Sequence, residues 1–106
     1  MNKLNMVTYK AKGVVIGYTW GGGLAGYASE NIVTSTLKNT KSEIKRRIED
    51  GTLDSGFGFE TVIGAIMKIT RIKTIQMNDG LYTNTRDSIH FFGKVPKDFR
   101  SIAKEL

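Results

Sequence analysis

The sequence of 106 residues contains no cysteine, one histidine, one proline and one tryptophan. Without cysteine there is no disulfide framework, no thiolate nucleophile and no cysteine-based zinc or iron–sulfur site. The lone histidine, His90, argues against a histidine-rich metal site. We therefore expect no metal and no cofactor.

Long hydrophobic runs are also missing. No apolar stretch approaches the ~18 residues that a membrane-spanning helix needs, and the segment 1–13 lacks the apolar core of a signal peptide. We expect no contact with a membrane and a location in the cytosol.

Acidic residues are outnumbered, ten against sixteen Lys and Arg, which gives a net charge of +6. The bases fall into three clusters, in segments 3–12, 38–47 and 68–73. If these clusters share a face, they form a basic patch suited to a polyanion or to an acidic protein surface.

A glycine-tipped hairpin is expected near the beginning of the chain. The segment Val14–Trp20 is rich in β-branched and aromatic residues, which favour a strand. Gly21–Gly23 interrupts this segment, and Tyr27–Thr36 is predicted as the return strand.

Two helices are expected next. Thr40 and Glu43 have the spacing of a capping box, with Ile44 and Ile48 on one face and Gly51 as the stop. Apolar residues then recur at spacings of three and four with few charges, which predicts a helix buried on most of its surface. These residues are Phe59, Val62, Ile63, Ile66, Met67 and Ile69.

The last third of the chain predicts a hairpin and a closing helix. Asn78-Asp79-Gly80 is a strong turn signal between strands at Thr70–Met77 and Ser88–Phe92, with Leu81–Asp87 partly loop. Pro96 opens a helix whose apolar positions recur at helical spacing, namely Phe99, Ile102, Ala103 and Leu106. We therefore predict a single α+β domain over residues 1–106, with antiparallel hairpins packed on a buried central helix in the order ββααββα.

The stretch Gly56-Phe57-Gly58-Phe59 resembles the central signature of an RNA recognition motif. Val14–Thr19 resembles the second signature of that family, but Val15 replaces its stacking aromatic. In the central signature, Ser55 replaces the Lys or Arg that contacts phosphate. The helical spacing after Phe59 favours a glycine loop that leads into a buried helix. An RNA-binding module stays an alternative.

Two further motifs could carry chemistry. The glycine loop Thr19–Tyr27 offers backbone amides for phosphate and two aromatics, Trp20 and Tyr27, but no Gly-Lys-Ser/Thr follows it. Ser88 and His90 are close in sequence, whereas catalytic triads are usually assembled from distant segments. We expect no enzyme.

The stretches "WGGG", "LDSGFGFETVIGA" and "NDGLYTN" resemble small accessory proteins encoded by phages and mobile elements of Gram-positive bacteria, anti-CRISPR and other anti-defence inhibitors among them. The resemblance implies a non-enzymatic protein in the host bacterial cytosol that engages a host defence nuclease or its nucleic acid. The contacts that we expect for this binding are Lys10, Lys12, Trp20, Tyr27, Lys41, Lys45 and Arg46.

A second hypothesis is a protein that sequesters a nucleotide signal. Its pocket would be built by the glycine-rich loops at the interface of a homodimer, from Gly22, Ser55, Phe57 and Arg71. A third hypothesis is a protein-interaction module that binds no nucleic acid. The sequence leaves the homodimer and the identity of the partner open.

Overall fold

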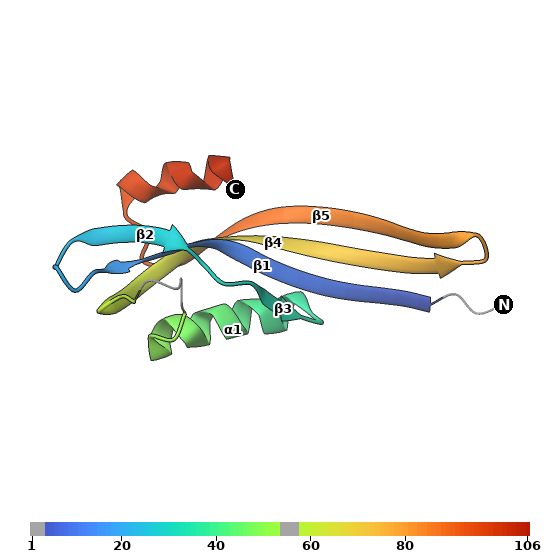
Figure 1. Cartoon of the computed structure of the whole chain (residues 1–106), viewed down its shortest axis with the longest axis horizontal. Coiled ribbons are helices and arrows are strands. Elements are labelled where there is room, and N and C mark those ends of the chain that lie inside the picture. Colours follow the sequence, from blue (N-terminus) through green and yellow to red (C-terminus); the bar gives the residue numbers. More distant parts are fainter. Residues whose placement is uncertain (1–3, 54–57) are drawn as a thin grey trace.

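The computed structural model describes residues 4–53 and 58–106, which form one five-stranded antiparallel sheet with a helix on each side (Figure 1). Four strands lie in the order β2-β1-β4-β5, and β3 pairs with β1 beside β2. The elements are β1 (Leu4–Tyr18), β2 (Leu24–Ala28), β3 (Ile32–Thr34), α1 (Leu37–Asp50), β4 (Thr61–Met77), β5 (Gly80–Gly93) and the 3-10 helix η1 (Lys97–Glu105).

The predicted ββααββα order is wrong, because the segment expected as a buried central helix is the first half of β4. The structure is 54% strand and 23% helix. Both faces of this half of β4 are covered. Ala65 and Met67 pack in the core beneath α1, while Ile66 is fully buried on the opposite face, where η1 lies (Figure 1). A strand buried on both faces loses its polar alternation, so its apolar spacing imitates that of a helix.

Two further expectations on strands need correction. Leu81–Asp87 is regular strand within β5 and not partly loop. Its polar composition reflects exposure on both faces, since every β5 residue from Gly80 to Ile89 is exposed. The predicted return strand Tyr27–Thr36 is divided into β2 and β3 by residues 29–31, although the glycine-tipped hairpin before it is confirmed.

Helix α1 begins earlier than predicted. The Thr36 hydroxyl accepts a hydrogen bond from the Asn39 amide (3.0 Å), which makes Thr36 the N-cap. Thr40 is not a cap: it is buried in the first turn and its hydroxyl donates to the Thr36 carbonyl (2.9 Å). The stop at Gly51 is confirmed by its left-handed φ of 71°.

The helix is held against the sheet by Ile44, which is fully buried, and by Ile48, which packs at the edge of the core. The closing helix is also present, as η1 after Pro96, and Phe99 packs toward Gly26 of β2. Each helix therefore covers one face of the same half of the sheet, the half in which β2 and β3 pair with β1.

The distal ends of β1, β4 and β5 continue beyond both helices as a three-stranded arm (residues 4–8, 72–77 and 80–85; Figure 1). The arm explains the elongated shape, with extents of 59 × 26 × 21 Å. Because no helix overlies it, both of its faces are open to solvent.

Candidate nucleic-acid interface

Helix α1 presents a flank of lysines toward β5. Lys38, Lys41 and Lys45 recur at spacings of three and four, which places them on one side of the helix. Lys41 lies near enough to His90 of β5 that its charge contributes to lowering the pKa of His90, after the larger effect of burial. This flank therefore faces the α1 side of the sheet close to β5.

The same face of the sheet carries three more bases where the arm begins. Side chains alternate along a strand, so residues that share a face with the core residues Met67 and Ile69 include Arg71 and Lys73. Arg86 of β5 lies directly opposite Arg71 of β4. We call these six residues the basic surface: Lys38, Lys41, Lys45, Arg71, Lys73 and Arg86.

None of the basic surface is neutralised within the described part of the chain. The ion pairs there involve only Arg46 and Arg47, so all six cations lack a carboxylate within 4.0 Å. Like charges directly opposite each other on a sheet are destabilising. The Arg71–Arg86 pair is therefore unfavourable in the free protein, and a bound anion would relieve it.

Lys10 and Lys12 lie on the other face of the sheet, the η1 side, because they alternate with the core residue Ala11. Carboxylates are close by on this face. Lys10 is in the same cross-strand row as Asp87, and Lys12 lines a cavity with Glu105. The predicted basic clusters therefore do not share one face.

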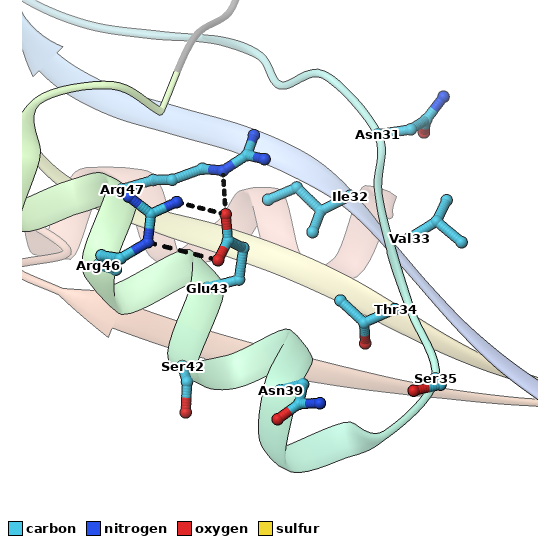
Figure 2. A pocket seen from close by; sticks show the side chains of 10 residues that line it. All are labelled: Asn31, Ile32, Val33, Thr34, Ser35, Asn39, Ser42, Glu43, Arg46 and Arg47. Atoms are coloured by element: carbon cyan, nitrogen blue, oxygen red, sulfur yellow. Dashed lines mark hydrogen bonds and ion pairs between the residues drawn. The ribbon is translucent and has the colours of Figure 1, made fainter.

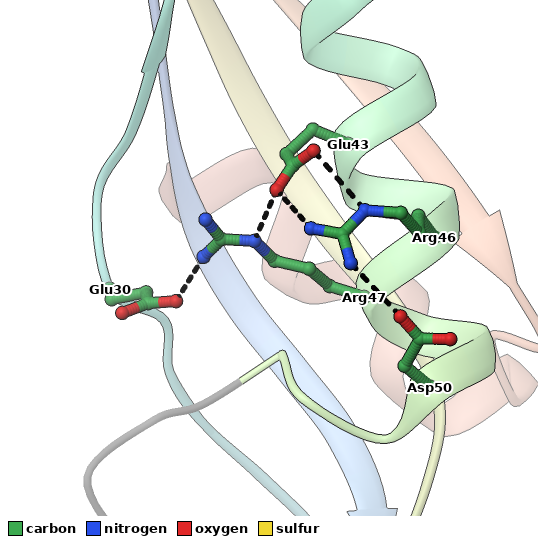
Figure 3. Close-up of polar contacts among 5 residues, drawn as sticks. All are labelled: Glu30, Glu43, Arg46, Arg47 and Asp50. Carbon is green, nitrogen blue, oxygen red and sulfur yellow. Dashed lines mark hydrogen bonds and ion pairs between the residues drawn. The ribbon is translucent and has the colours of Figure 1, made fainter.

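Arg46 is engaged on the opposite flank of α1 (Figure 3). It contacts Glu43 at 2.6 Å and Asp50 at 3.0 Å. Arg47 contacts Glu43 at 2.9 Å and also pairs with Glu30, which ties the helix to the loop before β3. Hydrogen bonds from Arg46 and then Arg47 lower the pKa of Glu43. These arginines are occupied by carboxylates of the protein itself.

A polar cleft of about 530 Å³ lies between this flank and the β3 segment (Figure 2). Its walls are mainly amide and hydroxyl side chains together with the ion pairs just described. Since Arg46 and Arg47 already share the Glu43 carboxylate, the cleft offers no unpaired cation for a phosphate. The lining residues are Asn31, Ile32, Val33, Thr34, Ser35, Asn39, Ser42, Glu43, Arg46 and Arg47.

The two predicted aromatic contacts differ in setting. Trp20 is 75% exposed at the β1–β2 turn, where a partner could reach it. Tyr27 is part of β2 and packs on Phe59, with ring centroids 5.3 Å apart. Neither lies on the arm.

Two residues of the alternative nucleotide pocket, Gly22 and Arg71, lie far apart within one copy of the chain. Gly22 is in the β1–β2 turn, whereas Arg71 pairs with Tyr9, half the length of β1 away. Nine residues of extended strand between Tyr9 and Tyr18 correspond to about 30 Å. Ser55 and Phe57 lie outside the described residues, as does most of the glycine loop in the RNA-recognition resemblance.

Ser88 and His90 share the α1 face of β5, and the Ser88 hydroxyl lies 2.8 Å from Nε2 of His90. The neighbouring Asp87 faces the other side and accepts a hydrogen bond from Thr70 (2.7 Å), so it does not orient the imidazole. Over residues 4–53 and 58–106, no group of three or more potential ligands could hold a metal ion. No helix in the same ranges is long and apolar enough to cross a membrane.

Three residues of the basic surface, Lys38, Lys73 and Arg86, are not among the contacts predicted from the sequence. A signal for Arg86 is nevertheless present. A two-residue turn at Asn78-Asp79 fixes the register of the hairpin, so residues equidistant from it, such as Arg71 and Arg86, must be opposite each other. The position of Lys38 depends on how α1 packs, which the pattern does not determine.

Comparison with protein-family models, curated proteins and solved structures finds no match to the chain. The resemblance to phage and mobile-element accessory proteins therefore remains a prediction. The basic surface is the feature from which a function can be inferred.

Proposed function

We propose that the protein binds nucleic acid through the basic surface and acts by binding rather than by catalysis. The observation that carries this proposal is the Arg71–Arg86 pair, two cations placed opposite each other with no carboxylate of residues 4–53 and 58–106 within 4.0 Å. A phosphate backbone would supply the missing negative charge and release its counterions.

The shape of the molecule supports the same conclusion. The arm projects past both helices (Figure 1). Its α1-side face continues the surface that carries Arg71 and Arg86. β-Ribbons are one of the elements that proteins place in nucleic-acid grooves. Tyr82 on this face is 49% exposed, and its hydroxyl donates to Asp79 at the hairpin tip (2.7 Å). Its ring is available to pack on a sugar or base.

The resemblance noted in the sequence gives this binding a biological setting. In it, the bound nucleic acid is the guide or target of a host defence nuclease, and the protein inhibits by occupying it. The chemistry of the basic surface is the same with or without this setting.

The experiment is a fluorescence-anisotropy titration of labelled single-stranded RNA, single-stranded DNA and duplex DNA at low and physiological salt. The double variant Arg71→Gln/Lys73→Gln removes two cations from the basic surface. The matched control Lys10→Gln/Lys12→Gln removes two cations from the other face of the same sheet. We expect only the first to weaken binding and to lower the salt slope, by about 0.9 for each phosphate that is no longer neutralised. Equal effects of the two variants, or no binding by the wild type, would refute the proposal.

A further inference from the structure

The outer edge of β5 is unpaired in the described part of the fold, although this strand runs from Gly80 to Gly93. The Lys94 amide donates to the Ile63 carbonyl (2.9 Å), one step beyond the Gly64–Gly93 pair. Hydrogen-bonded pairs alternate along an antiparallel ladder, so even-numbered β5 residues bond to β4. The N–H and C=O groups of the odd-numbered residues from Leu81 to Phe91 therefore point outward.

Several of the usual protections of an edge strand are missing from β5, whose charged side chains are Arg86 and Asp87. It contains no proline and no lysine, and its pairing with β4 has no bulge. It does carry exposed apolar side chains on the η1 face: Leu81 is 68%, Ile89 37% and Phe91 52% exposed. Such a strand is a template for pairing with another strand.

We propose that two copies of the chain pair antiparallel through their β5 edges, around a two-fold axis at Arg86. This register places Leu81 opposite the partner's Phe91 and Thr83 opposite the partner's Ile89. It also places Asp87 opposite the partner's Thr85. Leu81 and Phe91 therefore contact each other across the interface, and Ile89 contacts the methyl group of the partner's Thr83.

Neighbouring registers fit less well. A shift by two residues in one direction opposes Asp87 with the partner's Asp87, a like-charge pair. The shift in the other direction places Phe91 against the partner's Asp79, beyond the end of the strand. The register centred on Arg86 avoids both, but it opposes Arg86 with the partner's Arg86, a like-charge pair that a bound anion would relieve.

The dimer completes the basic surface, a consequence that rests on the proposed function. With the two-fold axis perpendicular to the sheet, both α1 faces lie on the same side. Arg71, Arg86, the partner's Arg86 and the partner's Arg71 then form one row across four adjacent strands, about 14 Å long at ~4.8 Å per strand. This length is similar to the ~12 Å width of the major groove of B-DNA. The composite site is therefore suited to phosphates on both strands of a duplex, and binding of a duplex relieves the repulsion at the axis.

The absence of cysteine allows a direct test of the register. In Arg86→Cys the two thiols face each other across a non-hydrogen-bonded pair, where Cα atoms are ~4.5 Å apart and a disulfide fits. In the matched variant Asn84→Cys the thiols lie about 13 Å apart along the strands. Mild oxidation of dilute protein should cross-link Arg86→Cys and not Asn84→Cys. Equal cross-linking, or none in either variant, overturns the proposal.

Sedimentation of the wild type with and without a short duplex DNA, at low and high salt, separates this inference from the proposed function. Thr85→Pro removes one outward N–H from the β5 edge, where proline is otherwise tolerated. The matched Val7→Pro removes an outward N–H from the β1 edge of the arm, since Gly13, in the same phase of β1, accepts from Ser29 on that side (2.8 Å). We expect dimers on duplex DNA for wild type and Val7→Pro, and monomers for Thr85→Pro. A dimer without DNA binding refutes only the proposed function; DNA binding by a monomer of wild type refutes only the dimer.

Discussion

Replacing Arg71 by Gln should stabilise the fold while it weakens binding. Two guanidinium groups that separate to ~7 Å repel by about 0.6 kcal/mol at the dielectric constant of water. Screening with a Debye length of ~8 Å reduces this to roughly 0.25 kcal/mol at physiological ionic strength. We therefore expect Arg71→Gln to raise the free energy of unfolding by about 0.6 kcal/mol in low salt and by almost nothing in 1 M salt.

Urea unfolding at several salt concentrations measures this difference, because urea adds no ions. Arg46→Gln is the contrasting control. It is the same chemical change on a residue that contacts Glu43 and Asp50, so it should lower stability in low salt. If Arg71→Gln is less stable than wild type in low salt, the favourable contacts of the Arg71 guanidinium outweigh its repulsion by Arg86. The reasoning for the anion site would then fail.

Three further predictions concern the fold. Ile44→Ala should cost ~2–5 kcal/mol in urea unfolding because the side chain is fully buried beneath α1, whereas Val33→Ala, 61% exposed, should cost less than ~0.5 kcal/mol; similar losses would contradict this packing. Gly64→Ala should lower the melting temperature sharply, since its Cβ would lie 2.1 Å from the Lys94 carbonyl oxygen, while Gly21→Ala, with nothing closer than 3.9 Å, should be nearly neutral. Burial and Lys41 lower the pKa of His90, so this side chain binds a proton less readily in the folded state than in the unfolded state. The free energy of unfolding should therefore fall as the pH drops from above the ordinary His pKa of ~6.5 through the lowered pKa of the folded state. A pH series of urea unfolding should show a flatter profile for His90→Gln, and an unchanged profile would rule out His90 as the source.

The local features that the sequence predicts well are those set by short-range chemistry. Gly51 ends α1, the glycine turn closes the β1–β2 hairpin, and Asn78-Asp79 closes the β4–β5 hairpin. Each places a glycine at a positive φ, 71° at Gly51, 89° at Gly22 and 144° at Gly80. None of them requires knowledge of what packs on what.

The error at Phe59–Ile69 has a tertiary cause. Whether Ile63, Ile66 and Ile69 belong to a helix or a strand depends on whether one face is covered or both, and both are covered here by α1 and η1. The abundance of β-branched residues was the stronger indicator of a strand. For the site, alternation from the turn places Arg71 opposite Arg86, but which face receives α1 is decided by packing.

The pairing of β1 with β4 has a consequence for folding. β1 precedes the other strands of this sheet in the chain, yet Leu4 pairs with Gln76 and Tyr18 with Thr61. Most of the hydrogen bonds of β1 therefore form only after β4 has been synthesised. Contacts between residues so distant in sequence slow folding because the loop between them must close first. During synthesis the β1–β2 hairpin and α1 can form early, but the sheet that would cover them does not exist. We therefore expect slow folding for a chain of this length, and an emerging β1 edge that other strands can reach until β4 arrives.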